Sequence, residues 1–324
     1  MKQHKIKWGI LGPGKIARKF ARSLKEVEDA ELYAVASRNI ERAAAFAKET
    51  GAGKVFGTYE EMLQDKAIDV IYVATPHSFH HEHTLLCLRA GKAVLCEKPF
   101  AINRKQVEEM VATARENKVF LMEAMWTPFL PHIQYVKEII DSEEFGKVKS
   151  LKADFGFETP FDEKGRLFLK SLGGGSLLDI GIYPVFIALH TLGKPEKISA
   201  TAQLGRTGID EDCEVIFNYA NGAQAHLYSS IIKNTPTTAV FELENARIKI
   251  RSKWHNPSTI EITTNEGTET KTFEVASYGY EFEARHVQEM LRQNKTESDV
   301  MTFEKSLELI SILDEIRKEI SLEY

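Results

Sequence analysis

The stretch Lys5–Ala17, KIKWGILGPGKIA, contains the pattern that decides the fold of the N-terminal half of the chain. An apolar run typical of a buried strand ends at Leu11, and glycine follows at positions 12 and 14. GPGKIA fits the dinucleotide-binding fingerprint G-x-G-x-x-G/A, with Ala17 in the last place. The strand before it and the helical pattern after it are the context that this fingerprint requires. A glycine turn without a ligand is the alternative interpretation.

Each small residue of this segment has a physical task in the dinucleotide interpretation. Gly12 allows a tight turn, Gly14 lets the backbone approach a pyrophosphate, and Ala17 permits close packing of the helix. The first amides of a helix have no partner inside the helix and bind phosphate oxygens. We therefore expect Gly12, Gly14, Lys15 and Ile16 to contact a cofactor.

The rhythm of the first 122 residues predicts repeated βαβ units. Short β-branched runs alternate with segments of helical period and length, and these runs are KIKWGIL, ELYAVAS, DVIYVAT, AVLC and VFLM. Strands that are apolar throughout are buried on both faces, as in a parallel sheet covered by helices. The fold class is therefore α/β, with a Rossmann, doubly wound parallel sheet in a first domain of residues 1–122.

The pattern changes after Met122. Strands become longer and alternate, and turn signals at Asn221–Gly222 and Asn265–Gly267 predict antiparallel hairpins. Helical patterns remain, and they cover Pro131–Asp141, Ser176–Leu192, Tyr280–Asn294 and Phe303–Glu323. Residues 123–324 are therefore expected to form a second, α+β domain.

Composition excludes several classes of protein. Of the 324 residues, 43% are hydrophobic and 27% charged, the balance of a globular chain, and no apolar run approaches the roughly 20 residues that span a bilayer. The net charge of −5, without a sustained basic run, predicts no nucleic-acid partner. The N-terminus lacks the pattern of a signal peptide, so we expect a cytoplasmic protein with a small-molecule partner.

Cysteine spacing indicates neither a disulfide framework nor a metal site. The three cysteines, Cys87, Cys96 and Cys213, are far apart, and we interpret them as reduced core residues. Four histidines occur in the segment PHSFHHEH, but no second cluster with ligand spacing accompanies them. No metal is expected.

The end of the second predicted strand bears on the choice of cofactor. An NAD-binding strand usually ends here in Asp or Glu, which holds the ribose 2′-hydroxyl. This chain has Ser37 and Arg38, and Arg42 follows four residues later. A hydroxyl and two guanidinium groups suit a 2′-phosphate, so the sequence favours NADP over NAD. The alternative is that both arginines are solvated surface charges.

A charged pair follows the apolar run AVLC, in the order Cys96–Glu97–Lys98–Pro99. Ligands of open α/β sheets bind at the carboxyl ends of the strands. A lysine at that edge, beside a positive nicotinamide, has its charged form disfavoured and can take part in proton transfer. Glu97 would orient the lysine or the cofactor ribose. A structural Lys–Glu pair is the alternative.

Three segments together resemble the Gfo/Idh/MocA family of nicotinamide oxidoreductases. They are ATPHSFHHEH, AGKAVLCEKP and GGGSLLDIGIYP, and the resemblance runs along nearly the whole chain. MEAMWTPFLP and the tyrosine that ends DIGIY are similar to the family's dimeric dihydrodiol dehydrogenase branch. The resemblance implies a Rossmann domain followed by an open, largely antiparallel sheet, through which homodimers or higher homo-oligomers form.

The resemblance also implies roles for individual residues. It assigns catalysis to Lys98 and places Asp179 and Tyr183 on a helix that faces it, with tyrosine where many members have histidine. A spacing of four residues puts Asp179 and Tyr183 on one helix face, and Gly181 between them is expected to leave room for a ligand. A nearby ammonium favours the anion of a tyrosine and makes it a usable acid or base. A core tyrosine with a satisfied hydroxyl is the alternative.

Further positions follow from the same resemblance. Thr75, His77 and His80 would lie beside the cofactor, whereas His81 and His83 would be surface residues.

Two aromatic residues are candidates for the substrate pocket. Trp126 and Phe157 would be walls of a sugar or diol pocket, although large aromatic residues often simply fill a core. Pro128 stands where the dihydrodiol dehydrogenase branch has arginine, a departure that bears on substrate choice.

These observations lead to one main functional hypothesis. The chain is expected to be an NADP(H)-dependent oxidoreductase that moves a hydride between nicotinamide and a carbon of a sugar, polyol or vicinal diol. Lys98 and Tyr183 would manage the proton and stabilise the developing alkoxide. The alternative is a nicotinamide-binding regulator without turnover, because a fold does not dictate a function.

Overall fold

The computed structural model describes residues 4–324, which form two compact units. The first runs to Trp126 and includes Val275–Leu307, and the second comprises Thr127–Glu274 with Glu308–Tyr324. Sequence reasoning assigned everything after Met122 to the second domain, whereas Val275–Leu307 belongs with the first unit. Helix α8 (Tyr280–Arg292) packs on helix α1, and the Leu121 amide donates to Thr296 O at 3.2 Å. No local sequence pattern predicts contacts between segments that are so far apart in the chain.

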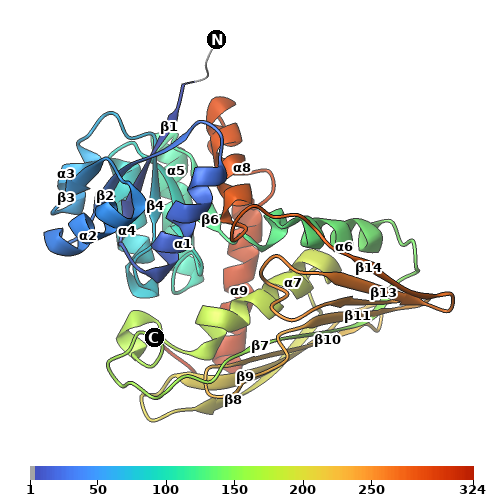
Figure 1. The fold of residues 1–324 in the computed structure, drawn as a ribbon. Helices are drawn as coiled ribbons and strands as arrows, with labels where there is room; N and C mark the ends of the chain where they lie inside the picture. Colours follow the sequence, from blue (N-terminus) through green and yellow to red (C-terminus); the bar gives the residue numbers. More distant parts are fainter. Residues whose placement is uncertain (1–3) are drawn as a thin grey trace. The chain divides into compact units, whose positions relative to one another are not determined.

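The first unit is built on a six-stranded parallel sheet in the order β3-β2-β1-β4-β5-β6. Its strands are β1 (Ile6–Leu11), β2 (Ala30–Ala36), β3 (Lys54–Phe56), β4 (Val70–Val73), β5 (Ala93–Glu97) and β6 (Leu121–Ala124). Strands β4 to β6 are buried at every position, as continuous apolar runs predict. This is the doubly wound order in which ligands bind at the carboxyl edge, and Figure 1 shows helices on both faces of the sheet.

Most helices of the first unit connect successive strands. They are α1 (Lys15–Ser23), α2 (Ile40–Thr50), α3 (Tyr59–Leu63), α4 (His80–Arg89) and α5 (Arg104–Asn117), with short 3₁₀ turns η1 (Leu24–Glu26) and η2 (His77–Phe79). Three helices start at side-chain caps, since Asn39, Thr58 and Asn103 accept from backbone amides three residues later. Helix α1 begins instead at Gly14, without a side-chain cap.

The second unit contains an eight-stranded mixed sheet in the order β14-β13-β12-β11-β7-β10-β9-β8. Its strands are β7 (Val148–Gly156), β8 (Lys197–Leu204), β9 (Asp210–Asn218), β10 (Gln224–Ser230), β11 (Ala239–Leu243), β12 (Arg247–Ile250), β13 (Ile260–Thr264) and β14 (Gly267–Lys271). All pairs are antiparallel except β7 with β10. Both predicted hairpins are confirmed, with β9–β10 around Asn221–Gly222 and β13–β14 around Asn265–Gly267.

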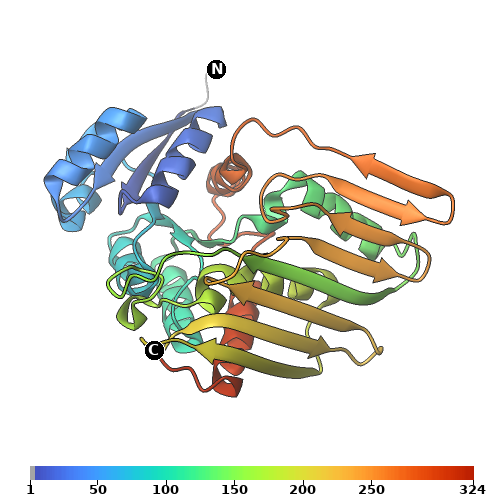
Figure 2. The ribbon, with the colours of Figure 1, turned by 60° about the horizontal axis from the view of Figure 1, so that its bottom comes forward.

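Helices cover one face of this sheet. They are α6 (Pro131–Asp141) and α7 (Ile182–Leu192), while α9 (Phe303–Glu319) starts in the first unit and ends in the second. Figure 2 shows the sheet face-on, open, with α6 and α7 behind it. Short helical turns complete the unit, namely η3 (Thr127–Phe129), η4 (Lys170–Leu172) and the π-helical turn η5 (Leu177–Gly181).

The stretch Lys170–Leu192 is long and apolar enough to cross a membrane by composition. However, 89% of its most apolar window is buried inside the protein, as in the core helix of a globular domain. The three cysteines are buried and free, which confirms their prediction as core residues.

Candidate active site

The glycine turn after β1 has the geometry that the fingerprint predicts. Gly12 has a φ of +88°, and a Cβ there would lie 2.9 Å from Ala74 O. A Cβ on Gly14 would meet nothing within 4 Å, so the space beside this residue is open. Ala17 is fully buried beneath α1. Glycine is thus needed at position 12 for the fold, whereas at position 14 it leaves room for a ligand.

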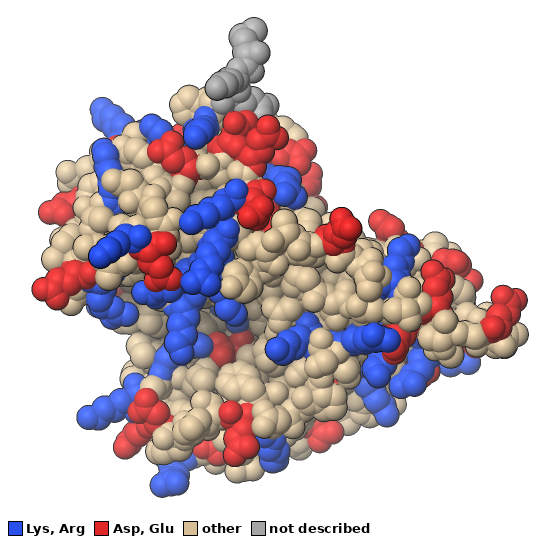
Figure 3. Space-filling view, in the orientation of Figure 1, with Lys and Arg blue, Asp and Glu red and all other residues tan. Residues whose placement is uncertain are grey.

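The N-terminus of α1 is suited to an anion. No side chain caps it, so the amides of Lys15 and Ile16 in its first turn are not engaged by a cap. Lys15 is exposed and Ile16 half-buried. Figure 3 shows basic side chains gathered over the α1 side of this unit, and α1 itself contributes Lys15, Arg18, Lys19 and Arg22. The dipole of the helix adds to this positive potential.

Two arginines follow the end of β2, where sequence reasoning placed the 2′-phosphate. Burial raises the pKa of the Tyr59 hydroxyl, while Arg38 and Arg42 both oppose this rise. Both guanidinium groups therefore act electrostatically on Tyr59. Arg38 also lies over the Phe79 ring, with Cζ 5.4 Å from its centroid. Ser37 is buried, and its Oγ accepts from the Asn39 amide at 3.2 Å.

The segment that follows β4 packs against the loop after β5. His80 is 1% exposed, with Nδ1 2.7 Å from Pro99 O and Nε2 2.8 Å from Thr75 O. Burial, with Lys98 as a further cause, lowers the pKa of His80 to about 4. The His77 ring is also buried, 5.7 Å from the ring of His80. Thr75, His77 and His80 thus lie together at this edge of the sheet.

One histidine of this segment was placed wrongly by sequence reasoning. His83, expected at the surface, is only 6% exposed, and its Nδ1 lies 3.0 Å from Thr75 Oγ1. Burial lowers its pKa. The reason is helical geometry, because α4 begins at His80 and a residue three positions later shares its inward face. His81 points away and pairs with Glu109 at 3.0 Å. Within residues 4–324 no group of His, Cys, Asp or Glu side chains is arranged to hold a metal ion.

Lys98 follows β5 directly and is half-buried. Its peptide bond with Pro99 is cis. Glu97 is 6% exposed, and its Oε1 accepts a hydrogen bond from the hydroxyl of Tyr72 in the neighbouring strand. Glu97 therefore anchors the end of β5 to β4, and this bond fixes the backbone from which Lys98 extends.

Two further carboxyl groups of the first unit are buried and interact with residues at the end of β5. Glu123 accepts from the Phe100 amide at 3.0 Å, and burial raises its pKa to about 7 although Lys98 opposes the rise. Glu283 of α8 is fully buried, and burial and Glu97 together raise its pKa well above the usual range. Both groups hold protons more tightly than a solvated glutamate does.

Trp126 lies two residues after the end of β6. It is 2% exposed and stacks on Tyr280, with ring centroids 4.4 Å apart and planes inclined by 12°. Pro128 lies in the buried turn η3.

In the second unit, Asp179 lies in the π-helical turn η5, and Tyr183 follows in the first turn of α7. The prediction that they share a helix face assumed an uninterrupted α-helix, and periodicity does not reveal a π-turn. Arg166, in the loop after β7, donates to the Asp179 carboxylate, with Nη1 2.7 Å from Oδ1 and Nη2 3.5 Å from Oδ2. Asp179 and Arg166 therefore form a charge-assisted ion pair.

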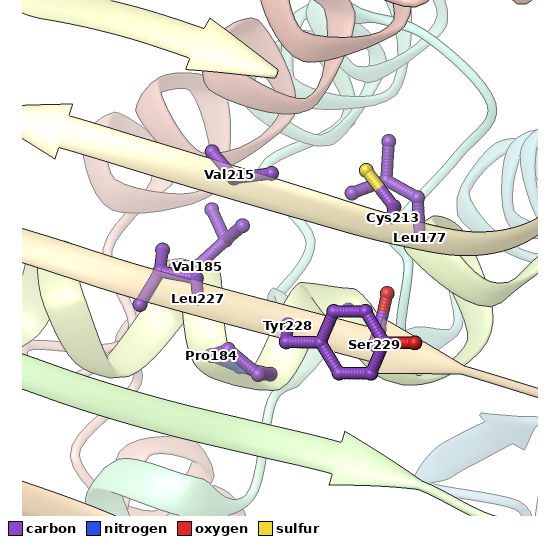
Figure 4. A pocket seen from close by; sticks show the side chains of 9 residues that line it. Leu177, Pro184, Val185, Cys213, Val215, Leu227, Tyr228 and Ser229 are labelled. Carbon is purple, nitrogen blue, oxygen red and sulfur yellow. The ribbon is translucent and has the colours of Figure 1, made fainter. Parts of the chain in front are cut away.

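Gly181 does not provide room for a ligand, which corrects the expectation from sequence. A Cβ at this position would lie 2.7 Å from Ser229 Oγ, so the glycine allows the helical turn to approach β10. The small pocket between this turn, α7 and strands β9 and β10 is shown in Figure 4. It is lined mainly by apolar groups such as Leu177, Val185 and Leu227 and belongs to the packing of helix on sheet.

Aromatic rings surround Tyr183. The ring of Phe155 lies 5.8 Å from it and that of His255 5.3 Å, while Phe155 and His255 stack at 3.8 Å. Phe157, a predicted substrate residue, contacts Phe155 edge-on at 6.2 Å. Sequence reasoning missed Phe155 and His255. Phe155 could have been found, because it is two residues from Phe157 in an extended segment and so faces the same side.

For other residues of the site, the sequence contains no pattern that would have indicated their role. Arg166 lies in a loop without periodicity, and Tyr59 begins a helix of five residues. Their relation to Asp179 and Arg38 depends on how distant segments pack.

The fold and these residues define a nicotinamide-binding oxidoreductase, and comparison with known proteins specifies the family. Residues 6–125 match the model "Oxidoreductase family, NAD-binding Rossmann fold", and residues 133–268 match the "GFO/IDH/MocA C-terminal domain". The chain belongs to the Gfo/Idh/MocA oxidoreductase family.

Individual relatives are similar along their whole length. A trans-1,2-dihydrobenzene-1,2-diol dehydrogenase from Xenopus tropicalis is 37% identical, over 98% of this chain and 99% of the relative. A scyllo-inositol 2-dehydrogenase (NADP(+)) from Bacillus subtilis is 34% identical, over 98% of both chains. Among solved structures, a 3-ketoreductase from Actinomadura kijaniata in complex with NADP and TDP-benzene has a TM-score of 0.88 at 26% identity, over 98% of both chains. These relatives are enzymes, so they give no support to the alternative of a regulator without turnover.

Proposed function

We propose that this protein is an NADP(H)-dependent oxidoreductase that transfers a hydride between nicotinamide and a carbinol or carbonyl carbon of a sugar, polyol or vicinal diol. One observation carries the proposal. The carboxyl edge of a single parallel sheet holds the glycine turn after β1, the Arg38–Arg42 pair after β2 and Lys98 after β5. The relatives that act on a dihydrodiol and on scyllo-inositol support this class of substrate.

The residues fit the cofactor. The open space beside Gly14 and the uncapped start of α1 suit a pyrophosphate, with Lys15 and Ile16 supplying amides. Arg38 and Arg42 suit a 2′-phosphate, which supports NADP over NAD. When bound, NADP would supply hydride chemistry. Thr75, His77, His80 and Glu97 would complete the binding edge.

Lys98 and Tyr183 would hold and move the proton that the substrate hydroxyl gains or loses. A general acid or base is most effective when its pKa lies near the working pH, and neighbouring charges adjust this value. Asp179, fixed by Arg166, would orient the reacting groups. Trp126 and Phe157 would be walls of the substrate pocket.

A homodimer formed through the eight-stranded sheet is the proposed assembly. The sheet face opposite α6 and α7 carries no helix, which supports this idea (Figure 2). A cytoplasmic location is supported by three buried cysteines that form no disulfide. We propose no membrane or nucleic-acid partner.

The proposed function is tested by screening the purified protein for NADPH formation with aldoses, polyols and dihydrodiols. Turnover with at least one of these substrate groups, and faster turnover with NADP than with NAD, is expected. Absence of turnover with every group, while NADP still binds, would contradict the proposal and favour a regulator.

A further inference from the structure

Tyr183 has a polar aromatic neighbour in a fixed position. His255 stacks on Phe155 with ring planes inclined by 17°, and it lies 5.3 Å from the Tyr183 ring. Its Nε2 is 2.8 Å from the Asn256 side-chain nitrogen. An imidazole clamped between an aromatic ring and an amide has little rotational freedom, so its polar edge is preorganised.

A second polar group, Arg166, is anchored to η5 through Asp179. Arg166 belongs to a loop that is tied down by Phe168, which is 2% exposed and packs in a cluster with Ile180. Asp179 fixes the guanidinium, yet 47% of the Arg166 side chain is exposed. A guanidinium carries five N–H donors in a rigid fork and can bind two oxygen atoms of a ligand while a carboxylate holds it.

We propose that Arg166 and His255 are specificity-determining residues that select a polyhydroxylated ring, such as a cyclitol or sugar, over an arene dihydrodiol. The proposal rests on the function proposed above and deepens it. A cyclitol carries hydroxyl groups beyond the reacting pair, and these can bind Arg166 and His255. The remaining ring of an arene dihydrodiol is apolar and would leave both polar groups without a ligand partner.

The expected discrimination between the two substrates, measured as a ratio of kcat/KM values, can be estimated from known binding sites. A site built to hydrogen-bond a substrate hydroxyl discriminates against the analogue that lacks it by up to roughly 10⁴- to 10⁵-fold, whereas apolar contacts discriminate by roughly 10- to 200-fold. Polar contacts therefore dominate the choice between these substrates, even in a site with aromatic walls.

The test compares kcat/KM for scyllo-inositol and for trans-1,2-dihydrobenzene-1,2-diol, with NADP and the full chain. Wild type should prefer scyllo-inositol. Arg166→Leu also releases Asp179, so it should lower kcat/KM for both substrates, but by at least about 10-fold more for scyllo-inositol than for the dihydrodiol. His255→Phe should lose about 10-fold or more on scyllo-inositol and change less than about threefold on the dihydrodiol. Arg166→Gln retains amide donors and should lie between wild type and Arg166→Leu. Arg206→Leu is the matched control, because this exposed arginine lies over the ring of Phe161, in the same loop as Arg166, with Cζ 4.9 Å from the ring centroid. It should leave both values unchanged.

Two results would overturn the proposal. One is a wild type that prefers the dihydrodiol. The other is an equal loss on both substrates in Arg166→Gln and His255→Phe, which would mean that the residues only support the fold. Thermal unfolding of each variant shows whether it still folds. If Arg166→Leu does not fold, the comparison of the two substrates in Arg166→Gln tests the proposal. Absence of turnover with either substrate and with all aldoses would contradict the proposed function itself.

Discussion

His80 Nδ1 lies 2.7 Å from the carbonyl oxygen of Pro99, so helix α4 is tied directly to the residue that follows Lys98. The other ring nitrogen lies 2.8 Å from Thr75 O. Because this imidazole is buried and its pKa is lowered to about 4, it is neutral at pH 7 and its single N–H can donate to only one of the two carbonyl oxygens. The histidine thus packs between two segments of the predicted cofactor edge without adding a charge beside Lys98.

This charge state predicts loss of stability in mild acid. The pKa of His80 is about 4 in the folded chain and about 6.5 when unfolded, so between these values the unfolded chain binds the additional proton. The contribution of His80 to the free energy of unfolding is complete above about pH 6.5 and falls as the pH drops below this value. At pH 5 the free energy of unfolding should be lower by about 2 kcal/mol from His80. Urea unfolding at pH 7 and pH 5 measures the difference.

The control for this prediction is His80→Gln, which should reduce the difference between the two pH values by about 2 kcal/mol. His132 in the second unit, also with a pKa lowered to about 4 by burial, should continue to contribute. An unchanged difference in His80→Gln would show that His80 is not held neutral.

The two glycines of the β1 turn should respond differently to alanine. Gly14→Ala places its Cβ in open space with an ordinary φ of −86°, so unfolding should barely change while affinity for NADP falls. Gly12→Ala requires a φ of +88° and a contact of 2.9 Å with Ala74 O, so it should destabilise the fold by about 1 to 3 kcal/mol. Thermal unfolding and NADP titration of both variants separate these effects. Equal NADP affinity in wild type and Gly14→Ala would show that no phosphate approaches Gly14.

Arg38 should decide the choice of cofactor. Arg38→Ala removes a charge-assisted contact of about 1.5 to 3 kcal/mol, equivalent to roughly 10- to 150-fold in NADP affinity, and NAD binding should change little. Arg42→Ala should act in the same direction but more weakly. The measurement is the ratio of the Kd values for NADP and NAD at one salt concentration, since salt screens phosphate contacts. A wild type that prefers NAD, or a ratio unaffected by Arg38→Ala, would contradict the assignment.

Much of the fold was predictable because its signals are local. Strand periodicity and the fingerprint at Gly12 define the parallel sheet, and the carboxyl ends of parallel strands meet at one edge. The positions of Arg38 and Arg42 directly after β2 and in the first turn of α2 follow from the strand pattern alone.

What sequence reasoning missed depends on packing between distant segments. The burial of His83 depends on where α4 begins, and Gly181 is explained only by its contact with Ser229. The ion pair of Arg166 with Asp179 joins a loop to a π-turn, and neither has a periodic pattern. The membership of Val275–Leu307 in the first unit likewise has no local signal.

Tyr183→Phe tests whether the tyrosine hydroxyl acts together with Lys98. The single variant should lose about 10²- to 10⁴-fold in kcat, as is typical of a proton-transfer group. Residues that act as a unit are not additive, so the double variant with Lys98→Met should lose less than the product of the single losses. Single-turnover rates measure this directly. Losses that multiply would indicate two independent roles.

The most direct test of the central claim, that Lys98 manages the proton, is Lys98→Met. This change keeps most of the side-chain stem but removes the ammonium, so the fold and NADP binding should persist. The measurement is the single-turnover rate of NADPH formation on the best substrate from the screen, together with the Kd for NADP. We expect the rate to fall by about 10²- to 10⁴-fold while the Kd changes little. A variant that keeps more than roughly a third of the wild-type rate would contradict the claim.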